Sequence, residues 1–164
     1  MSDRPRYIGQ RVKRTEDVRL VRGQARYVDD IRLPETLHVA FVRSPHAHGR
    51  VCSVDVSRAL AAPGVTAVFI AADLEGVAPM RSGTMDTPIC RQTEWPALAR
   101  DRVRYVGEAV AAVVAGDRYA AEDGALLVEV AYDPLPAVVD VGDALGADAP
   151  RLHDEWPDNV LMRT

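Results

Sequence analysis

The stretch that most constrains the fold is residues 103–115, VRYVGEAVAAVVA, in which only Arg104 and Glu108 carry a charge. The run contains five valines, and such β-branched residues favour a strand that is buried on both faces. Gly107 interrupts the run, and a glycine inside a strand usually marks a bend or a bulge. We therefore expect two strand segments that meet at Gly107 and form the centre of the fold.

A helix and another strand are predicted directly after this run. Asp117 can cap a helix over residues 118–126, because its side chain can accept hydrogen bonds from backbone amides of the first turn. Residues 127–132 return to an extended pattern, which Asp-Pro-Leu-Pro at 133–136 ends. Together these segments predict a β-α-β unit in which one helix packs on a sheet.

The remaining elements are predicted from alternation and turn residues. Residues 37–43 are apolar on both faces, which indicates an inner strand, and a turn at 44–49 makes residues 50–56 its hairpin partner. Ser57 is expected to cap a short helix that ends before Pro63 and Gly64. Further strands are predicted at 24–28 and 65–70, a brief extended piece at 138–139 and a short helix at 140–145.

The composition indicates a soluble globular protein. The 164 residues are 48 % hydrophobic and 27 % charged. No apolar run is long enough to span a bilayer and the N-terminus lacks a signal-peptide core, so we expect a cytoplasmic protein that does not bind membranes. Cys52 and Cys90 are expected to be free thiols. Nucleic-acid binding is poorly supported, because few aromatic residues accompany the arginines of the basic N-terminal region.

Two pairs of polar residues could carry metal or acid-base chemistry. His46 and His48 could supply two metal ligands, but the sequence places no third ligand, and their position in a turn beside Pro45 favours a structural role. Asp29 and Asp30 could act as paired carboxylates. Adjacent acidic residues after a strand more often bond to their own backbone.

Two single residues are also candidates. Cys90 lies in a long aperiodic stretch, residues 72–102, of the kind that is usually functional or mobile, but no histidine lies near it in sequence. Glu108 is a charge inside an apolar run, and it is either paired at the bend, by default with a nearby arginine, or functional. The sequence contains no G-x-G-x-x-G, P-loop or C-x-x-C motif. These residues do not form a complete catalytic constellation.

The order of several short motifs resembles the N-terminal a/b hammerhead domain of the molybdenum hydroxylases: the large subunits of xanthine dehydrogenase, aldehyde oxidase and aerobic carbon-monoxide dehydrogenase. The resemblance covers residues 8–159 and is greatest to the bacterial carbon-monoxide-dehydrogenase-like branch. One departure is Ala109, where proline is frequent. The motifs are Arg14-x-Glu16-Asp17, Arg19-Leu20-x-Arg22-Gly23, ARYVDDI at 25–31, RSPHAH at 43–48, PGV at 63–65, VGEAVAAVVA at 106–115, AAED at 120–123 and VEVAYDPLPAV at 128–138.

The resemblance implies an α+β hammerhead fold with a mixed sheet, one main packed helix and short additional helices. It also implies an N-terminal arm at residues 1–22, the hammerhead domain at 23–146, and at 147–164 a linker with little to pack, leading toward absent molybdopterin-binding domains. In this family the molybdenum is bound to molybdopterin cytosine dinucleotide in those later domains, and 2Fe-2S clusters and FAD lie on partner chains. We therefore expect no catalytic residue, metal or cofactor within this chain, and no activity from it alone.

Family resemblance also places the loop before the central strand, residues 89–95, near the mouth of the substrate channel. The candidate channel residues are Arg91, Gln92, Glu94 and Trp95. The whole enzyme would oxidise an aldehyde, an N-heterocycle or carbon monoxide. Two other functions stay open: a non-catalytic binding or assembly module, and a small metal-dependent hydrolase built from the acidic and histidine pairs described above.

Overall fold

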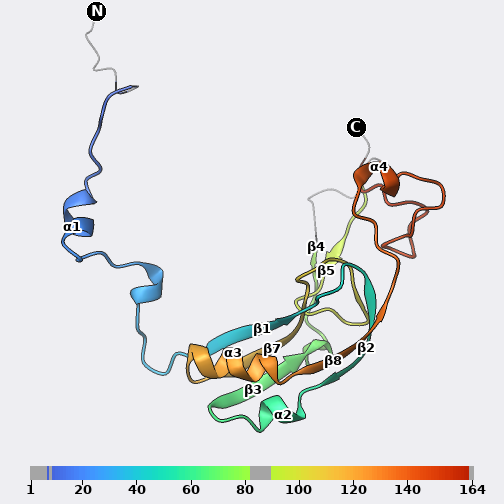
Figure 1. The fold of residues 1–164 in the computed structure, drawn as a ribbon, viewed down its shortest axis with the longest axis horizontal. Coiled ribbons are helices and arrows are strands. Elements are labelled where there is room, and N and C mark those ends of the chain that lie inside the picture. Colours follow the sequence, from blue (N-terminus) through green and yellow to red (C-terminus); the bar gives the residue numbers. More distant parts are fainter. Residues whose placement is uncertain (1–6, 8, 82–89, 163–164) are drawn as a thin grey trace, which may run out of the picture. The chain divides into compact units, whose positions relative to one another are not determined.

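The computed structural model describes residue 7, residues 9–81 and residues 90–162. It divides into two units, residues 1–36 and residues 37–164 (Figure 1). The described part of the first unit holds the helix α1 (Asp17–Val21) and the 3-10 helix η1 (Val28–Asp30). The strand predicted at 24–28 is wrong. The carboxylate of Asp30 accepts a hydrogen bond from the Tyr27 amide at 2.9 Å and closes a turn there instead.

The central element of the second unit is β7 (Ala109–Ala115), as predicted. It lies between β1 (His38–Arg43) and β3 (Val65–Ile70) in an antiparallel sheet of order β1-β7-β3. Val110 and Val113 are almost completely buried. The predicted interruption is also confirmed, because Gly107 adopts a φ of 92°, a conformation that favours glycine, and separates β7 from β6 (Arg102–Val103).

The prediction that the segment at 37–43 is an inner strand is wrong. β1 is an edge strand of its sheet, and the side chains of Val39 and Phe41 remain 52 % and 47 % exposed. Only its alternate positions face the buried side. Apolar residues on both faces therefore did not signal burial on both faces.

A second sheet has the order β6-β2-β8, with β2 (Gly49–Asp55) paired to both neighbours and β8 (Glu129–Pro134) at its edge. The predicted hairpin between β1 and β2 is therefore wrong, because the two strands belong to different sheets. The backbone of Ser44 explains the change of sheet, since it bonds to Gly107 and Glu108 at 2.8 and 2.9 Å and fixes the chain before β2 begins. The same division separates β7 from β8, so the strand-helix-strand unit links two sheets.

The main helix is α3 (Arg118–Leu126), and Asp117 caps it as predicted, accepting from the Ala120 amide at 2.9 Å. It packs on the sheet of β1, β7 and β3 (Figure 1). The short helix α2 (Ser57–Leu60) is present, but Ser57 is not its cap. The carboxylate of Asp55 instead accepts from the Ser57 amide at 2.9 Å.

The remaining elements are short. They are η2 (Ala71–Leu74), the two-stranded ribbon of β4 (Met80–Arg81) and β5 (Glu94–Trp95), and α4 (Val141–Ala144), whose cap is Asp140. Residues 138–139 belong to no strand. The α+β class is confirmed, with every described strand pair antiparallel. Among the described residues, no helix is long and apolar enough to cross a membrane.

Candidate functional site

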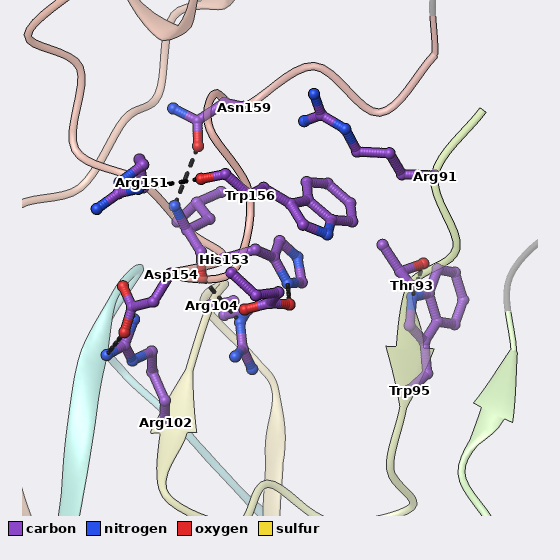
Figure 2. Close-up of polar contacts among 12 residues, drawn as sticks. Arg91, Thr93, Trp95, Arg102, Arg104, Arg151, His153, Asp154, Trp156 and Asn159 are labelled. Atoms are coloured by element: carbon purple, nitrogen blue, oxygen red, sulfur yellow. Dashed lines mark hydrogen bonds and ion pairs between the residues drawn. The ribbon is translucent and has the colours of Figure 1, made fainter. Parts of the chain in front are cut away.

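The C-terminal segment, residues 151–162, packs against β6 and residues 90–104 of its own unit. Figure 2 shows the guanidinium of Arg102, at the start of β6, paired with the carboxylate of Asp154. The pair is bidentate, with Nη1–Oδ1 at 3.0 Å and Nη2–Oδ2 at 2.7 Å, and the Arg102 side chain is only 11 % exposed. The expectation that this segment offers little to pack is therefore wrong.

A second ion pair connects the C-terminal segment to the predicted channel loop. Arg91 Nη1 lies 2.6 Å from Asp158 Oδ1, and the guanidinium lies over the ring of Trp156 at 5.2 Å. The ring of His153 also stacks on the Trp156 ring, and the two ring centroids are 4.3 Å apart. Arg91 of the loop thus holds the C-terminal segment through one ion pair and one cation–π contact, and the His153–Trp156 stack lies within the segment itself.

Backbone contacts complete this arrangement. Arg104 Nε donates to the Leu152 carbonyl at 3.0 Å. Asn159 folds the segment on itself. Its side-chain oxygen accepts from the Leu152 amide at 3.0 Å (Figure 2), and its side-chain nitrogen donates to the Pro150 carbonyl at 3.0 Å. The Cys90 backbone also forms a β-bridge with Met162.

Two clefts lie between the ribbon, the loop after β6 and the C-terminal segment. The larger, about 510 Å³, is polar and is lined in part by Gln92 and Glu94. The smaller, about 300 Å³, is lined by Glu94 and Trp95. Arg91 lines neither of these clefts and instead holds Asp158. The structure therefore brings the four predicted channel residues to one region. Gln92, Glu94 and Trp95 line the clefts, and Arg91 anchors the loop to Asp158. Ile89, also in the predicted loop, lies outside the described residues.

The charges around the clefts shift the pKa of their neighbours. The hydrogen bonds from Arg102 lower the pKa of the Asp154 carboxyl, and the same contacts raise that of Arg102. Burial lowers the pKa of His153, Arg104 lowers it further, and Glu155 opposes both. His153 is therefore held toward its neutral form.

Glu108 is buried at the end of the turn that joins β6 to β7, with 9 % of its surface exposed. Its Oε2 accepts a hydrogen bond from the Arg104 amide at 2.5 Å. Burial raises the pKa of this carboxyl, while the amides of Arg104 and Tyr105 and the charge of Arg104 lower it. Glu108 is paired at the bend, as expected, but with backbone amides, since the Arg104 guanidinium reaches Leu152.

The other candidate residues are not assembled into a reactive group. His48 is buried and its Nδ1 lies 2.8 Å from the Pro136 carbonyl, while the ring of His46 packs edge-on against Tyr132. The Cys90 thiol donates to the Arg91 carbonyl at 3.6 Å. In the part of the chain that the structure describes, no group of three or more His, Cys, Asp or Glu side chains could hold a metal ion.

Sequence reasoning missed Arg102, Asp154 and Asp158. Their partners lie 52 and 67 residues away in the chain, and acidic residues near prolines resemble a solvated linker. The one available signal was the arginine that directly precedes the buried run, because a long side chain beside a buried strand needs a carboxylate partner.

We expect Asp154→Asn to expose the C-terminal segment. The change removes the charge that Arg102 holds, and it leaves a mostly buried guanidinium without its counter-charge. Thermolysin should cut residues 147–162 several-fold faster at pH 7 than in the unmodified chain. Since the pKa of Asp154 is lowered in the fold, the protection should be full above the ordinary aspartate pKa and fade as the pH falls through the lowered value.

Asp148→Asn is the matched control, because Asp148 is an exposed acidic residue just before the C-terminal segment. It should leave the cleavage rate unchanged. Equal cleavage of Asp154→Asn and the unmodified chain would show that the ion pair does not hold the segment.

The sequence is similar to those of known proteins. Residues 22–136 match the family described as aldehyde oxidase and xanthine dehydrogenase, a/b hammerhead domain. The carbon monoxide dehydrogenase large chain of Afipia carboxidovorans is 44 % identical over 153 residues, which cover 93 % of this chain and 18 % of that protein. The nicotine 6-hydroxylase large subunit of Paenarthrobacter nicotinovorans is 42 % identical over 156 residues, covering 95 % and 19 %.

Two solved structures have the same fold as this chain. Quinoline 2-oxidoreductase from Pseudomonas putida 86 matches with a TM-score of 0.84 at 44 % identity, over 93 % of this chain and 19 % of that one. A Cu,Mo-CO dehydrogenase matches with a TM-score of 0.73 at 45 % identity, over 87 % and 17 %. The chain thus spans less than a fifth of the length of each of these relatives.

Proposed function

Because this chain belongs to the a/b hammerhead domain family of the aldehyde oxidases and xanthine dehydrogenases, as its motif order predicted, we propose that it walls the substrate channel of a molybdenum hydroxylase. The channel wall would be the segment from Arg91 to Trp95. One observation carries the proposal: Gln92, Glu94 and Trp95 line two clefts, and Arg91 anchors their loop to Asp158. Side chains held in this way can define an opening without taking part in bond making.

The proposal includes docking onto the molybdopterin-binding domains of the same subunit. Phe41 and Phe69 both pair with Ala112 in the sheet, so all three side chains share one face, and the two phenylalanines are 47 % and 42 % exposed. Exposed aromatic side chains grouped on a sheet face are typical of surfaces that meet another protein surface. The alternative is a binding or assembly module outside any enzyme, and such a module would bind its partner through the same face.

In the larger cleft Arg102 and Arg104 are already engaged by Asp154 and the Leu152 carbonyl, so these two guanidinium groups are not free to bind an anionic cofactor. We propose that molybdopterin cytosine dinucleotide is bound by other domains, with 2Fe-2S clusters and FAD on partner chains. The enzyme would oxidise an aldehyde, an N-heterocycle or carbon monoxide.

The test is Trp95→Ala in the molybdenum enzyme whose large subunit carries this chain. We expect kcat/KM to fall about tenfold through KM, because removing a lining side chain weakens the positioning of substrate and leaves the chemistry intact. Molybdenum content, measured by mass spectrometry, should not change.

Tyr119→Ala is the control, because Tyr119 is 78 % exposed on α3 and lines neither cleft. It should leave kcat/KM unchanged. An unaltered KM in Trp95→Ala would reject the channel role, and a purified chain that forms no such enzyme would favour the assembly module.

A further inference from the structure

The described part of the predicted channel loop, residues 90–95, is weakly held at its C-terminal end. Each of these residues is half-buried or exposed, so their side chains are not anchored in a core. At this end β5 forms a two-stranded ribbon with β4. An isolated ribbon of two strands is marginally stable, and the exposed ion pair between Arg81 and Glu94, at 3.5 Å, adds little. The position of the loop therefore depends on its N-terminal end.

The C-terminal segment holds this N-terminal end through Arg91. The Arg91 amide donates to the Leu161 carbonyl at 2.9 Å. Its guanidinium Nη1 lies 2.6 Å from Asp158 Oδ1 and donates to the Asp158 carbonyl at 3.1 Å. Charge-assisted hydrogen bonds of this length are about twice as strong as neutral ones. The contact with Asp158 is therefore the main attachment of the loop to the segment.

Asp158 is itself fixed within the C-terminal segment. Its Oδ1, the oxygen that contacts Arg91, also accepts from the Val160 amide at 3.1 Å. The Arg91 and Asp158 side chains are 30 % and 36 % exposed, so salt screens this pair less than a fully exposed one. The segment is in turn tied to β6 by the bidentate pair of Arg102 and Asp154 (Figure 2). Asp158 thus links the channel loop to the second sheet.

The link acts from outside the two clefts. Arg91 and Asp158 line neither of them, whereas Gln92 and Thr93, which follow Arg91 directly, line the larger one. A shift of Arg91 would move Gln92 as well, because the peptide bond keeps adjacent Cα atoms about 3.8 Å apart. Side chains that bind a ligand must be held to within about 0.5 Å of their working position. A change at Asp158 would therefore alter the larger cleft without removing a lining group.

We propose that Asp158 is a positioning residue of the substrate channel, which holds Gln92 and Thr93 in the wall of the larger cleft through Arg91. The inference rests on the proposed channel, and it adds a residue outside the channel wall that controls how well the channel binds substrate. Because Asp158 lies outside the clefts, its loss should weaken substrate binding and leave the chemical step intact. KM and kcat should therefore respond differently.

The test is Asp158→Asn in the molybdenum enzyme whose large subunit carries this chain. Asparagine has nearly the same shape and keeps an oxygen for the Val160 amide, so the change removes the charge and spares the local fold. KM should rise about three- to fivefold at unchanged kcat, the size expected when one partly exposed ion pair is lost. Asp148→Asn removes an exposed carboxylate just before the segment and should leave KM unchanged.

A double variant shows whether Asp158 acts through Arg91. Arg91→Ala should raise KM at least as much as Asp158→Asn does. Adding Asp158→Asn to Arg91→Ala should have no further effect, because two residues that act as one unit are not additive. In the 164-residue chain, Asp158→Asn should also shift the NMR signal of the Gln92 side-chain amide, and Asp148→Asn should not.

Four results would overturn the proposal: an unchanged KM in Asp158→Asn, a lower kcat without a higher KM, effects that multiply in the double variant, or an unshifted Gln92 signal. The Trp95→Ala variant tests the channel separately. A raised KM in Trp95→Ala but not in Asp158→Asn would keep the channel and reject the positioning role. An unchanged KM in both variants would reject both.

Discussion

Replacing Gly124 with valine should lower the free energy of unfolding by about 3 kcal/mol, the upper end of what overpacking a core costs. Gly124 lies on the face of α3 that packs against the sheet. A Cβ atom there would come within 2.7 Å of the Val65 Cγ2 and 2.9 Å of the Val113 Cγ1, closer than carbon atoms approach each other. Val113 is fully buried, so neither the helix nor β7 can move without opening the core.

Urea unfolding followed by circular dichroism measures the loss. Tyr119→Val is the matched control, because it places the same β-branched residue in α3 at a position that is 78 % exposed. The control should cost under about 0.5 kcal/mol, which is the propensity effect alone. If the two variants were equally stable, the close contact between α3 and β7 would not be part of the native packing.

The central part of this fold could be predicted because its signals are local. The valine-rich composition of β7, the φ requirement at Gly107 and the capping carboxylate of Asp117 each depend on residues close in sequence, and all three are present in the structure. Motif order then gave the family, which the comparisons confirm.

The partners of the strands could not be predicted in the same way. β1 and β2 are separated by one turn, which suggested a hairpin, but the pairing depends on backbone bonds from Ser44 to Gly107 and Glu108, more than 60 positions further along the chain. Alternation identifies which side chains share a face, but not whether another strand or solvent lies beside them. For this reason β1 was predicted as an inner strand, whereas the structure places it at the edge of its sheet.

The candidate site shows the same limit. Family resemblance indicated the loop that carries Gln92, Glu94 and Trp95, and these residues do line clefts. It could not indicate that Arg91 turns away to bind Asp158, or that Arg102 fixes Asp154, because both contacts join segments distant in sequence. Whether the clefts form the channel remains a prediction for the enzyme assay.

Glu108→Ala is expected to lower the free energy of unfolding by about 2 kcal/mol, because it removes the hydrogen-bond acceptor of the Arg104 backbone amide and leaves a void where the Glu108 side chain is buried. Glu108→Gln keeps an oxygen that can accept the same hydrogen bond, so it should cost under about 1 kcal/mol. A carboxylate needed for its charge would instead make the two variants equally unstable. Urea unfolding at pH 7 separates these outcomes.

The pH dependence gives a sharper test of the same carboxyl group. Burial raises the pKa of Glu108 in the fold, outweighing the backbone amides that lower it, so the folded protein binds this proton more tightly than the unfolded chain. Stability contributed by the protonated form is therefore full below the ordinary glutamate pKa and is lost as the pH rises through the raised value. The unfolding free energy of the unmodified protein minus that of Glu108→Gln should accordingly fall from pH 4 to pH 7. Because Asp154 and other titrating groups are common to both proteins, their contributions cancel in this difference. A difference that grows with pH would mean that the amides of the turn, rather than burial, decide the charge of Glu108.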